Sequence, residues 1–237
     1  EMYEKYERKT SISKTKIRAQ LLFMDILKER AETGRIYIMN IDHCNTHSSF
    51  KDKVYMSNLC QEITLPTTPL DHIDDTKGEI ALCILSAINL GLIRDKDELE
   101  GLCDLSVRAL DEIIDYQEYP IEAARISAES RRSLGIGYIG LAHFLAKNHV
   151  KYDDEKALEI VDETTEAFQY YLLKASNNLA KEKGKCEYFE KTKYSDGILP
   201  IDTYKKDLDK IIKRKLSYDW KQLRKDIQEH GLRHSTL

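Results

Sequence analysis

The pattern that most constrains the fold is a long amphipathic repeat from Asp153 to Lys183. Its mostly apolar positions step by three and four residues: Leu158, Val161, Thr165, Phe168, Leu172, Ala175 and Leu179. This spacing places one stripe of side chains on one face of an α-helix. Gly184 is a natural helix stop. The sequence therefore predicts a long helix, ended at Gly184, whose stripe must pack against other elements.

Further helices are predicted on both sides of this repeat from periodicity, caps and breakers. The expected segments are residues 15–33, ended by Gly34; a helix packed through Leu99, Leu102, Leu105, Ala109 and Ile113 and closed by Pro120; residues 121–147, with a glycine-containing interruption; a helix capped by Asp202 that carries Leu208 and Ile211; and a last helix capped by Asp219, with Leu223 and Ile227 inward and Gly231 at its end.

Three short segments favour β-structure. Residues 35–41 and 54–65 are rich in β-favouring side chains, and the second run stops at Pro66. The run EIALCILSAINLG is apolar throughout, so periodicity does not separate a buried strand from a buried helix. We take 79–85 as a strand, followed by a turn or helix. The predicted fold class is therefore α/β and helix-rich.

Composition excludes several classes of protein. The 237 residues carry a formal net charge of -4, which does not favour binding to nucleic acid or to an anionic membrane surface. No apolar run approaches the roughly 20 residues that span a bilayer, and no signal peptide is evident. Five cysteines with irregular spacing and no CxxC argue against a secreted disulfide scaffold, so we expect a cytoplasmic location. Because the chain starts at Glu1 without an initiator Met and stops straight after GLRHSTL, we expect a piece of something larger.

The stretch SNLCQE contains the most reactive pattern in the chain. Asn58, Cys60 and Glu62 occupy alternate positions. On a strand they would share one face, about 7 Å apart per step. An exposed strand edge with a chance cysteine is the simpler interpretation of the pattern alone. A buried carboxylate beside the thiol would instead need a partner or a role, and proton transfer suits such a group.

Other motifs are weaker. GIGYIG (135–140) matches a dinucleotide-binding fingerprint, but the preceding SAESRRSL is polar and helix-like, so glycines that bend or pack a helix are favoured. His43, Cys44 and His47 offer zinc ligands without an obvious fourth. A Cys60–His43 hydrolase pair lacks an orienting third residue. Cys103 and Cys186 are expected to be inert, and Cys83 by default a small core residue.

Several stretches together resemble one enzyme family. They are SNLCQEITLPT followed by GEIALCILSAINLG, IYIMNIDHCNTH, RRSLGIG, YYLLKASNNLAKE and GILPIDTYKKDLD. The chain also ends inside a W-x-x-L … G-L-R-H signature, formed by Trp220, Leu223, Gly231, Leu232, Arg233 and His234. The sequence is similar over its whole length to the large, catalytic subunit of class I ribonucleoside-diphosphate reductases from bacteria and T4-like phages.

The resemblance implies part of a ten-stranded α/β barrel, with residues 1–237 as the central segment of the catalytic barrel domain. The regulatory N-terminal part and the C-terminal part would lie outside this chain. By resemblance, Cys60 forms the transient thiyl radical and Glu62 accepts the 3′-hydroxyl proton. Asn58 and Glu62 bind the substrate ribose. Cys83 is one of two redox-active thiols, and its partner thiol lies outside the chain.

The resemblance also implies partners. They are the remaining segments of the large subunit, a small subunit with a metal/tyrosyl-radical cofactor, thioredoxin or glutaredoxin, and ribonucleoside diphosphates. ATP and dNTP effectors would bind elsewhere, no cofactor or metal would bind to this segment, and the location would be a bacterial or phage-infected host cytoplasm. Alone, the segment is expected to be inactive. The alternative is a non-catalytic helical interaction module that keeps the motif as a relic; neighbouring reading frames that encode the missing parts would argue against it.

Overall fold

The structure, a computed structural model, describes residues 2–211 and 215–237, in two compact units. The first, Glu1–Asn40, contains α1 (Met2–Arg8) and α2 (Ala19–Thr33). The predicted helix 15–33 is confirmed from Ala19 onward, and Gly34 ends it in the left-handed conformation with φ of 66°. The β-rich stretch 35–41 forms no strand, so that prediction is wrong.

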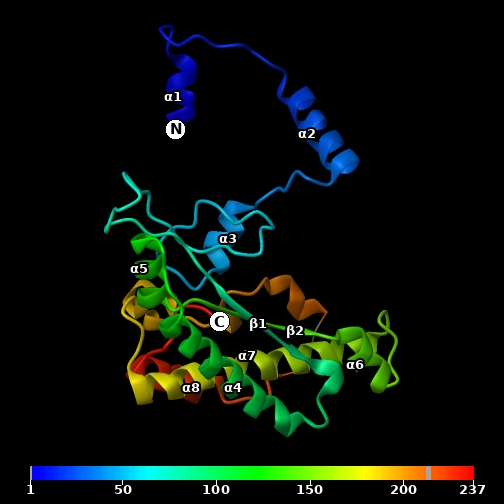
Figure 1. The fold of residues 1–237 in the computed structure, drawn as a ribbon. Coiled ribbons are helices and arrows are strands. Elements are labelled where there is room, and N and C mark those ends of the chain that lie inside the picture. Colours follow the sequence, from blue (N-terminus) through cyan, green and yellow to red (C-terminus); the bar gives the residue numbers. More distant parts are fainter. Residues whose placement is uncertain (1, 212–214) are drawn as a thin grey trace. The chain divides into compact units, whose positions relative to one another are not determined.

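The second unit, Ile41–Leu237, is a helix-rich α/β segment, as predicted, and Figure 1 shows its elements. In chain order they are α3 (Ile41–His47), β1 (Ile84–Asn89), α4 (Lys96–Tyr116), α5 (Glu122–Arg131), β2 (Leu134–Ile139), α6 (Leu141–Lys147), α7 (Glu155–Lys183) and α8 (Trp220–His230). Short 3₁₀ turns lie at Leu90–Leu92, Phe189–Lys191, Lys193–Asp196, Pro200–Asp202 and Lys206–Lys210.

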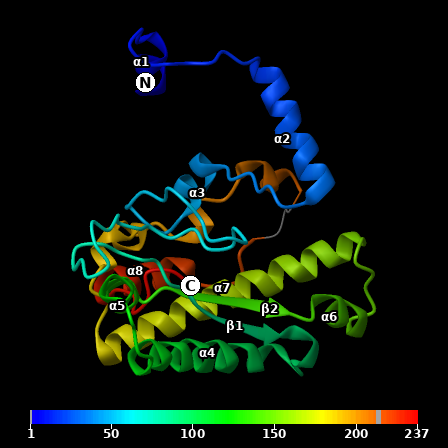
Figure 2. The same cartoon turned by 45° about the horizontal axis from the view of Figure 1, so that its top comes forward.

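β1 and β2 form a parallel pair, in register from Ile84 opposite Leu134 to Asn89 opposite Ile139. The crossover between them contains α4 and α5, and Figures 1 and 2 show the strands side by side along α4. Two predictions need correction here. β1 starts at Ile84 rather than at residue 79. β2 replaces the glycine-containing helix interruption, because the alternating small and apolar side chains of LGIGYI suit a strand that pairs with β1.

α4 and α7 pack against each other and against the strands. The buried face of α7 contains Phe168, Leu172, Ala175 and Leu179, which confirms most of the predicted stripe. α4 lies where it was predicted, but its buried face differs. The buried residues are Leu99, Cys103, Val107, Leu110 and Ile114, whereas Leu105 is 64% exposed. Both sets satisfy helical spacing, so periodicity alone did not identify the face that α7 covers.

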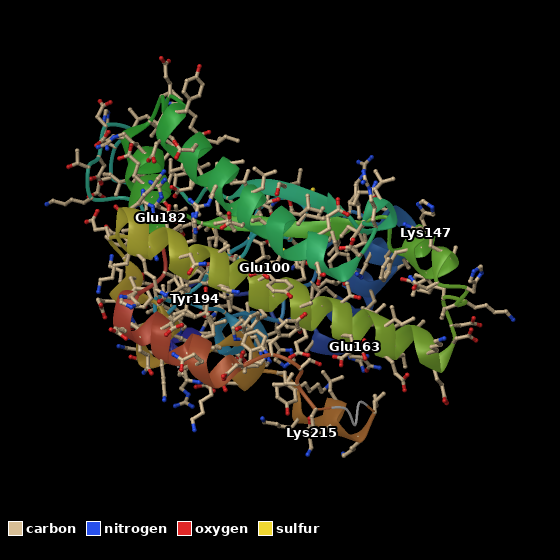
Figure 3. All side chains as sticks on the ribbon, turned by 90° about the horizontal axis from the view of Figure 1, so that it is seen from below. Glu100, Lys147, Glu163, Glu182, Tyr194 and Lys215 are labelled. Carbon is tan, nitrogen blue, oxygen red and sulfur yellow. The ribbon has the colours of Figure 1, made fainter. Side chains whose placement is uncertain are left out.

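Ion pairs along the edges of this contact add little. Lys174 Nζ lies 2.6 Å from Glu100, and Arg108 lies 2.6 Å from Glu182. Figure 3 labels Glu100 on α4 and Glu182 on α7. Each pair is solvent-exposed and is worth about 0–1 kcal/mol. Apolar burial between the helices therefore contributes most of the stability of this contact.

A second core cluster forms around α8, through Leu173, Trp220, Leu223, Ile227 and Leu232. Asp219 caps α8 by accepting a hydrogen bond from the Gln222 amide at 2.9 Å, as predicted. Among residues 203–211, the α-helix predicted after Asp202 does not form, and Lys206–Lys210 make a 3₁₀ turn. Asp202 instead accepts hydrogen bonds from the Leu199 amide and from Arg224 at 2.7 Å. Leu208 and Ile211 are exposed, so no packed face stabilises a helix there.

A buried ionic network joins α4 to the end of the chain. Asp111 accepts hydrogen bonds from Arg132 Nε at 2.6 Å and Arg233 Nε at 3.1 Å, and lies 3.2 Å from His234 Nε2. Burial opposes ionisation of Asp111, but its hydrogen bonds with His234 and Arg132 outweigh burial and hold its pKa below the usual range. Burial lowers the pKa of His234. The last residues are therefore part of the core.

Two elements beside the strands complete the unit. Lys147, labelled in Figure 3, donates to the Gly91 and Ile93 carbonyls and ties α6 to the turn after β1. The helices in residues 2–211 and 215–237 are too short or too polar to span a bilayer.

Candidate active site

Residues 54–65 form a loop rather than the predicted strand. Asn58 closes it: its amide donates to the Ile63 carbonyl at 3.3 Å, and its side-chain oxygen accepts from the Ile63 amide at 3.0 Å. The Gln61 amide donates to the Asn58 carbonyl, and Gln61 has φ of 68°. An Asn side chain that bonds nearby backbone competes with sheet pairing. Strand alternation therefore does not explain how these residues are oriented.

The turn leaves Asn58, Cys60 and Glu62 exposed, and Glu62 also lines a cavity. Asn58 and Cys60 are both exposed, and Cys60 is a free thiol. The side-chain oxygen of Asn58 already closes the turn. Of the predicted site residues, Glu62 and Cys83 line a shared cavity of about 630 Å³. Asn58 and Cys60 are not among its lining residues.

The cavity is built where the cysteine-bearing loop meets both strands. The loop contributes residues 62–65, the region of β1 contributes Cys83, Leu85 and Ser86, and β2 contributes residues 134–137. The charge of Glu62 reaches Cys83 across this space. Burial, followed by the negative charge of Glu62, raises the pKa of the Cys83 thiol to about 11. Cys83 is thus kept protonated near neutral pH, as a hydrogen donor rather than a thiolate.

Gly135 allows β2 to pass this close to Cys83. A Cβ atom at position 135 would lie 2.5 Å from Leu85 Cδ2 and 3.1 Å from Cys83 Sγ. The GIGYIG stretch lies on β2, and Gly140, at φ of 75°, precedes α6. The prediction that these glycines bend or pack a helix is therefore wrong. In the structure, Gly135 makes room for the thiol that faces it.

Two polar atoms in the cavity wall lack a partner. Ser86 Oγ and Gln169 Nε2 are buried and have no hydrogen-bond partner among the residues that the structure describes. Leaving such a buried atom unpaired costs about 1–3 kcal/mol. Sequence analysis missed them. The available signal was a polar residue inside an otherwise apolar segment, ILSAIN for Ser86 and FQYY for Gln169.

The other motifs, which involve His43, His47, Cys103 and Cys186, form no functional site among the described residues. His43 and His47 lie one turn apart on α3, with ring centroids 6.4 Å apart. Within the described part of the chain, no group of three or more His, Cys, Asp or Glu side chains is arranged to hold a metal ion. Burial raises the pKa values of Cys103 and Cys186 to about 12, which fits the expectation that both are inert.

Comparison with known proteins agrees with the resemblance. The family model described as "Ribonucleotide reductase, barrel domain" matches residues 1–237. The chain is 60% identical to the ribonucleoside-diphosphate reductase subunit alpha of Haemophilus influenzae over 240 residues, 100% of this chain and 32% of the relative. It is 57% identical to ribonucleoside-diphosphate reductase 1 subunit alpha of Escherichia coli over 239 residues, all of this chain and 31% of the relative.

A phage relative is also similar: the ribonucleoside-diphosphate reductase subunit alpha of Enterobacteria phage T4 is 43% identical over 242 residues, which cover all of this chain and 31% of that protein. The chain is thus a helix-rich α/β segment with a thiol and a carboxylate on one cavity. It belongs to the ribonucleotide reductase barrel-domain family. It spans about a third of the length of these curated relatives.

Proposed function

We propose that residues 1–237 are the central segment of the catalytic barrel domain of a ribonucleoside-diphosphate reductase. With its companion segments, the chain would reduce ribonucleoside diphosphates to 2′-deoxyribonucleoside diphosphates for DNA synthesis. The family match supports this proposal. The observation that carries it is the cavity shared by Glu62 and Cys83.

The proposed first steps use the loop residues. A thiyl radical on Cys60 removes the hydrogen atom from the ribose 3′ carbon, and Cys60 becomes a thiol. Glu62 accepts the 3′-hydroxyl proton, which eases loss of the 2′-hydroxyl as water. Asn58 holds the ribose hydroxyls beside Cys60. Asn58 and Cys60 are exposed on a turn, and the next residues of that turn form the cavity wall. A substrate at the mouth of the cavity would therefore contact Asn58, Cys60 and Glu62.

The proposed reduction uses Cys83. The thiols of Cys83 and of a partner cysteine on a companion segment together give two electrons and two protons. One proton leaves with the 2′-hydroxyl as water, the other ends on the 2′ carbon, and Glu62 returns its proton to the 3′ oxygen. The two sulfurs finish as a disulfide, and Cys60 returns its hydrogen atom to the 3′ carbon, which regenerates the thiyl radical. The raised pKa of Cys83, about 11, keeps its proton available for the departing hydroxyl. Thioredoxin or glutaredoxin would reduce the disulfide between turnovers.

The remaining partners follow from the same proposal. A small subunit with a metal/tyrosyl-radical cofactor would supply the oxidising equivalent to Cys60. ATP and dNTP effectors would bind to other parts of the large subunit. We place this assembly in the cytoplasm of a bacterium or of a phage-infected host. Alone, the chain should not reduce any ribonucleotide, because Cys83 lacks its partner thiol.

The test is deoxynucleotide formation in a mixture of the chain, the companion segments and the small subunit. Cys60→Ser should abolish turnover, because a hydroxyl hydrogen is far harder to remove than a thiol hydrogen. Glu62→Gln should lower kcat by roughly 10²–10⁴-fold, the usual contribution of a positioned base. Cys83→Ser should stop sustained turnover.

A matched control is Cys44→Ser on α3, which makes the same chemical change at a partly buried cysteine outside the lining of the cavity. The control should keep its activity. Full turnover in the Cys60→Ser mixture would overturn the assignment of the radical to Cys60.

A further inference from the structure

We propose that Arg131 is a positioning residue that holds both ends of the cysteine loop, defined here as residues 52–79. Arg131 Nη2 donates to Asp52 Oδ2 at 2.8 Å, at the start of the loop. Arg131 Nε and Nη2 donate to the two carboxylate oxygens of Glu79, at 2.6 and 3.2 Å, at its end. One planar guanidinium therefore joins two residues that are 27 positions apart in the chain.

The site of this clamp is buried. The side chain of Arg131 is 3% exposed and that of Glu79 is 7% exposed. The guanidinium carbon lies 5.8 Å from the centroid of the Phe50 ring and 5.1 Å from that of Tyr188. Buried, bidentate, charge-assisted hydrogen bonds are stronger and more directional than exposed ion pairs. The contacts of Arg131 therefore define where the loop begins and ends.

The loop has little structure of its own between these anchors. No helix or multi-residue strand occurs in residues 52–79, which all lie within the described residues. Its internal backbone contacts are an isolated bridge between Thr68 and Glu79, the turn closed by Asn58, and a hydrogen bond from the Asp75 amide to the His72 carbonyl at 3.0 Å. Long loops without secondary structure depend on how their ends are held. The positions of Cys60 and Glu62 should therefore follow the geometry of Arg131.

The neighbouring residue provides a matched control. Arg132 is also buried, with a side chain that is 5% exposed, but it binds Asp111 and Asp115 on α4. Within the part of the chain that the structure describes, no hydrogen bond or ion pair of Arg132 reaches the cysteine loop. Arg131→Lys and Arg132→Lys make the same change at adjacent buried sites, each replacing a forked guanidinium by a single ammonium. They separate an effect on the loop from a loss of core stability.

Hydrogen exchange of the full chain, read peptide by peptide, tests the clamp. Arg131→Lys should speed exchange in residues 52–79 about tenfold or more, the effect of losing one charge-assisted hydrogen bond, and leave α4 peptides nearly unchanged. Arg132→Lys should speed exchange in α4 and leave the loop close to wild type. Equal changes in the loop for the two variants, or no change for Arg131→Lys, would overturn the proposal.

A milder variant covers the case in which Arg131→Lys does not fold. Asp52→Asn removes the charge from the partly exposed partner alone, whose side chain is 37% exposed. It should speed exchange at the start of the loop in the same direction and by a smaller factor. Exchange in Asp52→Asn that matches wild type throughout the loop would contradict the clamp.

The link to catalysis rests on the proposed function and has its own readout. In the reconstituted reductase, Arg131→Lys should lower kcat by up to about 10²-fold, the cost of a misplacement near 1 Å, while Arg132→Lys keeps kcat within a few-fold. A faster-exchanging loop with unchanged kcat would overturn the positioning role. The Cys60→Ser test separately decides whether the reductase assignment fails.

Discussion

Replacing Asp111 by asparagine should destabilise the protein far more than the same change elsewhere on α4. The Asp111 carboxylate is fully buried and contacts Arg132, Arg233 and His234. Asparagine has nearly the same shape, so the change removes charge without opening a cavity. It leaves guanidinium groups in a buried site with one fewer negative partner.

The loss of stability in Asp111→Asn depends on which ion pairs remain. Removing one partner of a buried ion pair costs about 3–5 kcal/mol. Asp115 still accepts from Arg132 at 2.7 and 2.9 Å, so we expect a loss near the lower end of that range, about 3 kcal/mol. This is a large part of the roughly 5–15 kcal/mol that stabilises a folded protein.

Urea unfolding followed by Trp220 fluorescence measures this loss, since Trp220 is the only tryptophan of the chain and is buried. With a slope of about 2 kcal/mol per molar, the midpoint of Asp111→Asn should fall by about 1.5 M. A variant that is already unfolded without urea would agree with the same reasoning.

The control is Asp104→Asn, also on α4, whose carboxylate is 41% exposed and pairs with Arg108 at 2.9 Å. An exposed pair contributes about 0–1 kcal/mol, so this midpoint should move by less than about 0.5 M. Equal shifts in the two variants would refute the reasoning, because the burial of Asp111 would then have no energetic consequence.

Three further predictions concern pH, the cavity and α8. Burial lowers the pKa of His234, so below about pH 6.5 the unfolded chain binds a proton that the folded chain does not. The free energy of unfolding should therefore be highest above about pH 6.5. It should fall below that pH by up to about 1.4 kcal/mol per pH unit. His234→Gln should weaken the dependence of the urea midpoint on pH between pH 5 and 6.5. An unchanged pH dependence would contradict this. Glu62→Gln should lower the pKa of Cys83 from about 11, because the negative charge of Glu62 is removed while the burial of Cys83 remains. The rate of Cys83 alkylation as a function of pH measures this pKa. An unchanged pKa would argue against the shared cavity. Glu166 Oε1 accepts from Trp220 Nε1 at 2.9 Å and from the Ser217 amide at 2.8 Å. Glu166→Ala removes this acceptor, so it should cost about 1–3 kcal/mol and shift Trp220 emission to the red. Emission and a urea midpoint like those of wild type would count against it.

The helices were predictable where local signals agree. α7 combines a long apolar stripe with a glycine stop, and α8 combines an Asp219 cap with inward Leu223 and Ile227. The buried face of α4 was not predictable, because which of two stripes is covered depends on α7. Residues 54–65 have strand-like composition but pair with neither β1 nor β2, and Asn58 supplies a competing turn.

Some residues of the candidate site were predicted from the sequence and others were missed. The family resemblance identified Glu62 and Cys83, and both line one cavity in the structure. Whether Asn58, Cys60, Glu62 and Cys83 perform the proposed chemistry stays a prediction. Arg131 was missed, because its importance arises from contacts across the chain. Gln169 was missed although a polar residue inside an apolar segment was a local signal. Arg131 and Asp52, for example, are 79 residues apart, and no local pattern marks such a pair.

The network around Asp111 also orders events during synthesis of the chain. Arg132 follows Asp111 by 21 residues, whereas His234 follows it by 123. At roughly 5–20 residues per second, the ribosome delivers the first partner within about 1–4 s and the second only after about 6–25 s. Until then α4 can be held by Arg132 alone, and the surface that Leu232 and His234 later cover stays open to water. Chaperones should therefore need to protect a nascent chain of this sequence until Leu232 and His234 emerge from the ribosome.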